Sequence, residues 1–129
     1  MISGQFSEQG ELIFEIELVA VNGEQIAVDV LLDTGFTTGF LAIHADDLEA
    51  LDWSVLAAEV EMQTARGIEY FDIYEGRAIV DGKEFIIPVH VGGELTEILL
   101  GRQWLIPSCI QGINLFFSYL SVLCASVVR

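Results

Sequence analysis

The chain has 129 residues, of which 53% are hydrophobic and 19% charged, and its 20 acidic residues outnumber 5 basic ones to give a net charge of −15. This composition suits one folded domain and excludes a disordered or low-complexity chain. Residues 1–65 contain 13 acids and no Lys or Arg. Nucleic acids and anionic membrane surfaces are bound through cationic side chains, so neither is expected as a partner.

The first predicted element is a β-hairpin. Residues 12–21 and 25–32 are rich in Ile, Val, Leu and Phe. Asn22-Gly23 between them is the strongest signal for a two-residue hairpin turn. Glutamates alternate with apolar residues in the first segment, which predicts a strand with one face in water.

The middle of the chain predicts further short elements. Residues 42–51 are expected to form a surface helix, because their apolar side chains fall near one helical stripe. Residues 60–74 are expected to form two strands around residues 65–67. A second hairpin is predicted at Asp81-Gly82, and Pro88 indicates that its second strand lies at a sheet edge or ends its ladder there.

The candidate catalytic residue is Asp33, which follows an apolar run in the segment Val28-Asp29-Val30-Leu31-Leu32-Asp33-Thr34-Gly35-Phe36. Burial of a lone carboxylate is unfavourable unless the group is paired or protonated. A strand that ends on an Asp therefore either turns the chain or presents the acid for a reaction. An Asp-Thr-Gly turn without chemistry is the simpler alternative, and Asp29 is interpreted as a structural or exposed acid.

A second segment, Ile98-Leu99-Leu100-Gly101-Arg102-Gln103-Trp104-Leu105, favours the catalytic interpretation. It predicts a buried strand, a glycine and a short helix. With Asp-Thr-Gly some 65 residues earlier, the chain resembles the retroviral-type (retropepsin-like, clan AA) aspartic proteases over about residues 12–117. With Phe36 directly after the triplet, the chain resembles a non-viral microbial subgroup of single-domain members of this family.

This resemblance implies an all-β fold, a small closed acid-protease barrel with one or two short helices, as a single domain spanning residues 1–129. It implies an endopeptidase without metal or cofactor that cleaves peptide or protein substrates. Two Asp33 carboxylates, one from each subunit of a homodimer, would activate a water. The residues that it implies are Asp33, Thr34 and Gly35 in the catalytic triplet, Ala65, Arg66, Gly67 and Ile68 in a flap over the substrate, and Gly101 and Arg102 in the loop packed beside the site.

The sequence departs from the family pattern at two places. Phe36 stands where a small residue, Ser or Ala, is usual, although Thr37 or Thr38 could donate a hydrogen bond instead. These threonines also occupy the positions where Arg102 would find an acidic partner. A non-catalytic binding or scaffold module on the same fold is the alternative function.

Other candidate features predict structural roles. Cys109 and Cys124 do not make a disulfide framework, and His44 and His90 lack metal-ligand spacing, so they are expected in the core or in solvent. Trp53 and Trp104 are predicted in the core. The N-terminal residues lack a signal-peptide pattern, which predicts a cytoplasmic protein.

The C-terminal region allows two interpretations, a buried strand or a membrane-spanning helix. Gly112–Val128 is uncharged, but as a helix its 17 residues would span about 25 Å, short of the ~30 Å hydrocarbon layer. A buried strand is therefore preferred, and a membrane-tethered protein is the alternative. By the resemblance, Ile113–Phe117 would be a strand of the dimer interface, and residues 118–129 an additional tail.

Overall fold

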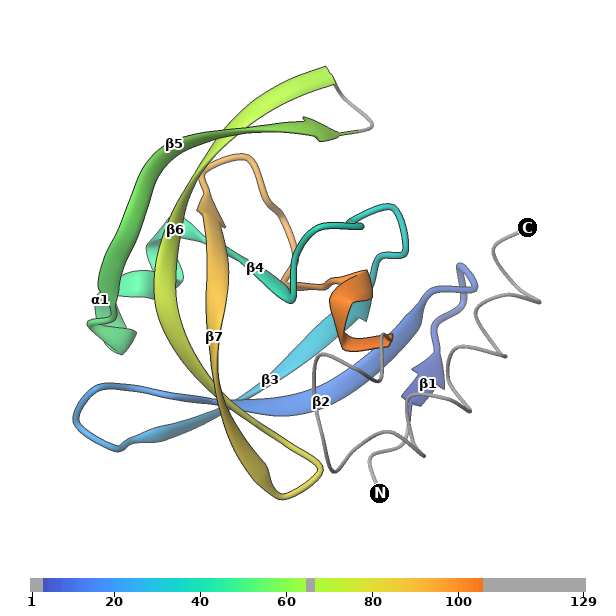
Figure 1. The fold of residues 1–129 in the computed structure, drawn as a ribbon. Helices are drawn as coiled ribbons and strands as arrows, with labels where there is room; N and C mark the ends of the chain where they lie inside the picture. The colour runs from blue at the N-terminus through green and yellow to red at the C-terminus, as the bar shows by residue number, and fades with distance from the viewer. Residues whose placement is uncertain (1–3, 65–66, 106–129) are drawn as a thin grey trace.

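The structure, a computed structural model, describes residues 4–64 and 67–105. Within them, eight strands form one sheet in the order β1-β2-β3-β8-β4-β7-β6-β5 (Figure 1). An all-β domain was predicted, and this is confirmed. The elements are β1 (Gly4–Phe6), β2 (Leu12–Val19), β3 (Gln25–Leu32), β4 (Leu41–His44), η1 (Ala45–Asp47), α1 (Leu48–Leu51), β5 (Ser54–Thr64), β6 (Gly67–Val80), β7 (Lys83–Gly92), β8 (Leu99–Leu100) and η2 (Arg102–Leu105).

Both predicted hairpins are present, with different turns. Asp81 and Gly82 join β6 to β7 as a two-residue turn in which both have positive φ, 55° and 77°, as a type I′ turn requires. The connection from β2 to β3 is longer than the two residues predicted. Its extra length lets Val21 donate its N–H to the carbonyl oxygen of Leu51 at 3.0 Å, so the connection is held by α1.

The helix predicted over residues 42–51 is wrong in its first part. Residues 42–44 belong to β4, which pairs parallel with β7 and antiparallel with β8. Leu41, Ala42 and Ile43 are all buried between these neighbours, so sheet pairing outweighs the helical stripe. Helical structure begins only at η1 and continues through α1, where Leu51 enters the core.

A ring of pairings encloses the core. Strands β2, β3, β8, β4, β7 and β6 pair in succession, and β6 pairs back with β2 at Glu17–Ile79 and Leu18–Ala78. Pro88 lies on the part of β7 that pairs only with β6, just before β4 joins at Val89. The largest fully buried side chains are those of Trp104, Phe14, Leu41, Ile43, Leu51, Val30, Val80 and Val89.

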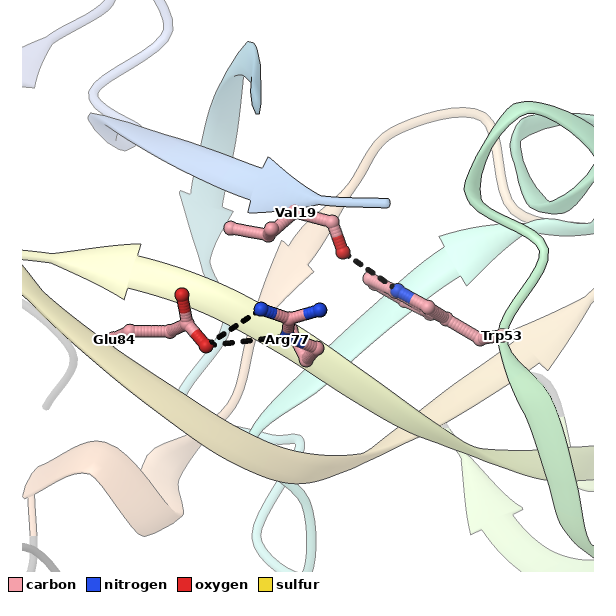
Figure 2. Close-up of polar contacts among 4 residues, drawn as sticks. All are labelled: Val19, Trp53, Arg77 and Glu84. Carbon is pink, nitrogen blue, oxygen red and sulfur yellow. Dashed lines mark hydrogen bonds and ion pairs between the residues drawn. The ribbon is translucent and has the colours of Figure 1, made fainter. Parts of the chain in front are cut away.

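Two polar contacts connect neighbouring elements around this core (Figure 2). The indole of Trp53, just before β5, donates to the carbonyl oxygen of Val19 at the end of β2, 2.9 Å away. Trp53 is buried, as predicted, and so is Trp104. The Arg77 guanidinium donates twice to one carboxylate oxygen of Glu84, at 3.1 and 3.0 Å. Exposed pairs of this kind contribute little to stability.

Several predictions concern residues outside the described ranges. They are the strand Ile113–Phe117, the uncharged stretch Gly112–Val128, the tail 118–129, and the two cysteines, Cys109 and Cys124. In the part of the chain that the structure describes, no helix has the length and hydropathy needed to cross a membrane.

Candidate active site

Asp33 lies directly after β3, and its own turn orients its carboxylate. The Asp33 N–H donates to the carbonyl oxygen of Leu100 at 3.0 Å, which extends the parallel pairing of β3 with β8. The Phe36 N–H donates back to the Asp33 carbonyl oxygen at 3.1 Å, and the Gly35 N–H donates to Asp33 Oδ1 at 2.9 Å. This combination of a β-turn and a side-chain turn holds the partly buried carboxylate in one orientation.

The segment around Gly101 fixes the loop that follows Asp33. The Gly101 N–H donates to the carbonyl oxygen of Phe40, and the Arg102 N–H donates to that of Phe36, both at 2.8 Å. A Cβ on Gly101 would overlap the carbonyl oxygen of Gly39. Only a residue without a side chain allows the two backbones to approach this closely.

A cavity of about 430 Å³ opens beside Asp33. The β5–β6 hairpin, whose course Figure 1 shows, borders it, but neither of the two predicted flap residues that the structure describes, Gly67 and Ile68, is among the lining residues. Gly67 begins β6, Ile68 is exposed, and Ala65 and Arg66 are outside the described residues. The cavity is lined by Asp33, Gly35, Phe36, Thr37, Thr38, Ala42, Glu61, Met62, Gln63, Glu69, Phe71, His90, Leu95 and Leu99.

Only some of the predicted site residues border the cavity. Asp33 and Gly35 border the cavity, whereas Thr34 is partly buried and is not among the lining residues. The Arg102 side chain is exposed, and within the described ranges it makes no ion pair with an acid. Arg102 acts on the Asp33 loop through its backbone N–H instead.

Gln103 is a structural residue of the site that the sequence analysis missed. Its side-chain amide donates to the carbonyl oxygen of Thr37 at 2.7 Å and so ties η2 to the loop after Asp33. No local pattern in the sequence indicated this contact, because it joins residues 66 positions apart in the chain.

Phe36 supports the site by packing. Its ring is buried and meets the His90 ring edge to face, with centroids 5.0 Å apart and an interplanar angle of 89°. A Cβ on Gly39 would overlap the Phe36 ring. The unusual residue after Asp-Thr-Gly is therefore an apolar anchor for the loop.

His90 is a buried residue of the cavity wall, which agrees with one of the two predicted environments for the histidines. Burial lowers the pKa of its imidazole below the ordinary value of 6.5. Its Nδ1 has no hydrogen-bond partner in the described structure. His44 is more exposed, and its ring caps η1 by accepting the Asp46 N–H at 3.0 Å. No group of three or more His, Cys, Asp or Glu side chains in residues 4–64 and 67–105 is arranged to hold a metal ion.

Comparisons with known proteins address the fold. No protein-family model matches the sequence, and no curated protein matches it. A retropepsin-like aspartic protease from Rickettsia conorii is similar in structure, with a TM-score of 0.56, 22% identity, and coverage of 83% of this chain and 77% of that one. The EIAV protease, in complex with the inhibitor HBY-793, is similar with a TM-score of 0.60, 14% identity, and coverage of 83% and 96%. The chain therefore has the retropepsin-like fold.

Proposed function

We propose that this protein is an aspartic endopeptidase that works as a homodimer, with Asp33, Thr34 and Gly35 as its catalytic triplet. The observation that carries the proposal is the placement of the Asp33 carboxylate. It lies at the end of β3, oriented by the Gly35 N–H, on a cavity that the β5–β6 hairpin borders. The retropepsin-like fold supports the same assignment.

The reaction requires a second carboxylate. Peptide hydrolysis needs a base that takes a proton from water and an acid that gives a proton to the substrate. Two adjacent carboxylates provide both, since like charges so close cannot both ionise and therefore share one proton. The sequence holds one Asp-Thr-Gly triplet. We therefore assign the second carboxylate to Asp33 of another copy, related by a two-fold axis.

The other parts take supporting roles in the proposal. Thr34 hydrogen-bonds between the two active-site loops, and Gly35 keeps backbone rather than a side chain beside the dyad. The β5–β6 hairpin closes over the peptide and excludes water from the reaction. Each subunit carries a net charge of −15, so apolar contact and strand pairing must outweigh repulsion, and salt should favour the dimer.

The first test is the variant Asp33→Asn, assayed with a library of fluorogenic peptides. The amide cannot take part in proton transfer, so turnover should fall at least about 100-fold while the melting curve is retained. Asp29→Asn is the matched control, because Asp29 is exposed on β3, the strand that leads to Asp33, and does not border the cavity. If Asp33→Asn keeps its turnover, or the wild type binds peptides without cleaving any, the scaffold alternative is favoured.

A mixing experiment tests the shared site. If each site needs two Asp33 carboxylates, one part of wild type assembled with three parts of Asp33→Asn should leave about a quarter of the activity per wild-type chain, because subunits pair at random. The dimer must be dissociated and reassembled before the assay. Unchanged activity per wild-type chain would show that one chain suffices.

A further inference from the structure

Part of the β5–β6 hairpin extends beyond the rest of the sheet. In the described part of the chain, β7 pairs with β6 only from Asp72 to Val80, and β5 pairs with no strand other than β6. Residues 60–64 and 67–71 therefore pair only with each other, as a two-stranded arm that can be followed in Figure 1. A two-stranded ribbon without further support is marginally stable, so the direction of this arm has to be fixed at its base.

The base of the arm holds an irregularity in β5. Two residues of β5, Ala58 and Glu59, lie opposite the single residue Asp72 of β6, between two regular pairs of the ladder. Glu59 has a φ of 52°, in the left-handed region that a residue with a Cβ rarely adopts. A β-bulge of this kind bends its strand and increases the local twist. The bulge thus sets the direction in which the arm leaves the sheet.

A side chain of the opposite strand stabilises this bulge. The extra residue of a β-bulge has no partner in the ladder. Here the Glu59 N–H donates to Asp72 Oδ1 at 2.9 Å. Hydrogen bonds to an ionised acceptor are stronger than those between neutral groups. Because the backbone of Asp72 pairs with Val91 of β7, its carboxylate joins the bulged strand to the part of the sheet that includes β7.

The residue that precedes Asp72 packs the base of the arm on β7. Phe71 is buried, and its ring centroid lies 6.0 Å from that of His90. A Cβ on Gly92 would overlap the Phe71 ring. The arm is therefore anchored at Phe71, and its other residues project from this point.

The arm forms one wall of the cavity beside Asp33. The arm residues that line this cavity are Glu61, Met62, Gln63, Glu69 and Phe71. Because their backbone belongs to the arm, the direction that the bulge gives to the arm determines the shape of the cavity. Residues in rarely populated backbone conformations persist only where the surrounding structure holds them, and they are concentrated at functional sites.

We propose that Asp72 is a positioning residue of the candidate active site. Its carboxylate holds the Glu59 bulge, and through the bulge it holds the arm in the position that shapes the cavity beside Asp33. Asp72 is not among the cavity-lining residues, so it acts through the arm. The effect on cleavage rests on the proposed protease function, whereas the effect on the arm is independent of that function.

Hydrogen exchange of the full chain tests whether Asp72 holds the arm. Asp72→Ala leaves the Glu59 N–H without its acceptor, so amides of residues 61–64 and 67–70 should exchange about tenfold faster, the size expected for loss of one hydrogen bond to a charged group. Asp72→Asn keeps an acceptor oxygen and should stay near the wild type. Glu75→Ala is the matched control, because Glu75 is an exposed acid of β6 that does not border the cavity.

Cleavage tests the consequence for the site. For a fluorogenic peptide that the wild type cleaves, kcat/KM should fall by up to about tenfold in Asp72→Ala, because fewer molecules hold the arm in place. It should recover in Asp72→Asn and stay unchanged in Glu75→Ala. Deletion of Glu59 is a second variant, since it leaves Ala58 opposite Asp72 in a regular ladder. The melting temperature should then be retained while kcat/KM falls.

The outcomes separate this inference from the proposed function. Faster exchange of the arm in Asp72→Ala and its rescue in Asp72→Asn, without cleavage by the wild type, would support the hold of Asp72 on the arm and contradict the protease. Asp33-dependent cleavage that Asp72→Ala leaves unchanged would support the protease and overturn the positioning role. Equal effects of Asp72→Ala and Glu75→Ala, or faster exchange that extends over residues 73–80, would also overturn it, because the loss would then be a general one of stability.

Discussion

The side-chain amide of Gln103 donates a hydrogen bond to the carbonyl oxygen of Thr37, 2.7 Å away, across 66 residues of sequence. With the bond from the Arg102 N–H to the Phe36 carbonyl oxygen, it fixes two consecutive peptide units of the loop after Asp33. The position of the candidate catalytic carboxylate therefore depends on the segment that follows β8.

Replacement of Gln103 by Met should loosen this loop. The variant keeps the length of the side chain but loses the donor to Thr37, so we expect the free energy of unfolding to fall by about 1 kcal/mol. Urea denaturation at fixed protein concentration measures the change, and kcat should fall with it if the loop positions Asp33. Gln25→Met, at the exposed start of β3, is the control and should leave both values unchanged. Equal effects of the two variants would contradict this role for Gln103.

Gly101→Ala should disturb the packing of two loops. The added Cβ would overlap the carbonyl oxygen of Gly39, so backbone must move, and such overpacking destabilises a fold by about 1–3 kcal/mol. Gly93→Ala is the matched control, because a Cβ there meets no atom within 4 Å. The melting temperatures of both variants measure the effect. A Gly101→Ala protein as stable as Gly93→Ala would contradict the close approach of Gly101 to the carbonyl oxygen of Gly39.

Asp29→Lys should stabilise the β2–β3 hairpin. Asp29 lies directly opposite Glu15 on the exposed face, and like charges in this position destabilise a pair of strands. We expect a gain of about 0.5–1 kcal/mol, which high salt should reduce. Glu8→Lys is the control, because it changes the net charge by the same amount but lies in the connection between β1 and β2. Only a gain in the free energy of unfolding larger than that of Glu8→Lys supports repulsion between Asp29 and Glu15.

His90 should make stability depend on pH. Burial lowers its pKa in the folded state below the ordinary value of 6.5, so the unfolded chain binds more protons between these two values. The contribution is fully present above about pH 6.5 and is lost as pH falls toward the folded pKa. Between pH 7.5 and 5, the urea midpoint of the wild type should fall more steeply than that of His90→Phe. All carboxylates are common to both proteins, so parallel curves would contradict the lowered pKa.

Local signals in the sequence determined several parts of this protein. Asp81-Gly82 supports a type I′ turn through its own backbone preferences, and alternating Glu and apolar residues define the faces of β2. The placement of Asp33 at the end of an apolar strand was predictable in the same way. Each of these features depends on residues close together in the chain.

Tertiary structure decided the rest. Residues 42–44 could satisfy a helical stripe or a strand, and only the simultaneous pairing with β7 and β8 selects the strand. The contacts of Phe36 with His90 and of Gln103 with Thr37 join positions more than 50 residues apart. The register of β5 against β6 sets the face on which Glu69 lies. The backbone preferences of short segments do not distinguish between alternative pairings of these segments. The difference in free energy between the pairings comes from packing and hydrogen bonds that form only when the whole sheet is assembled.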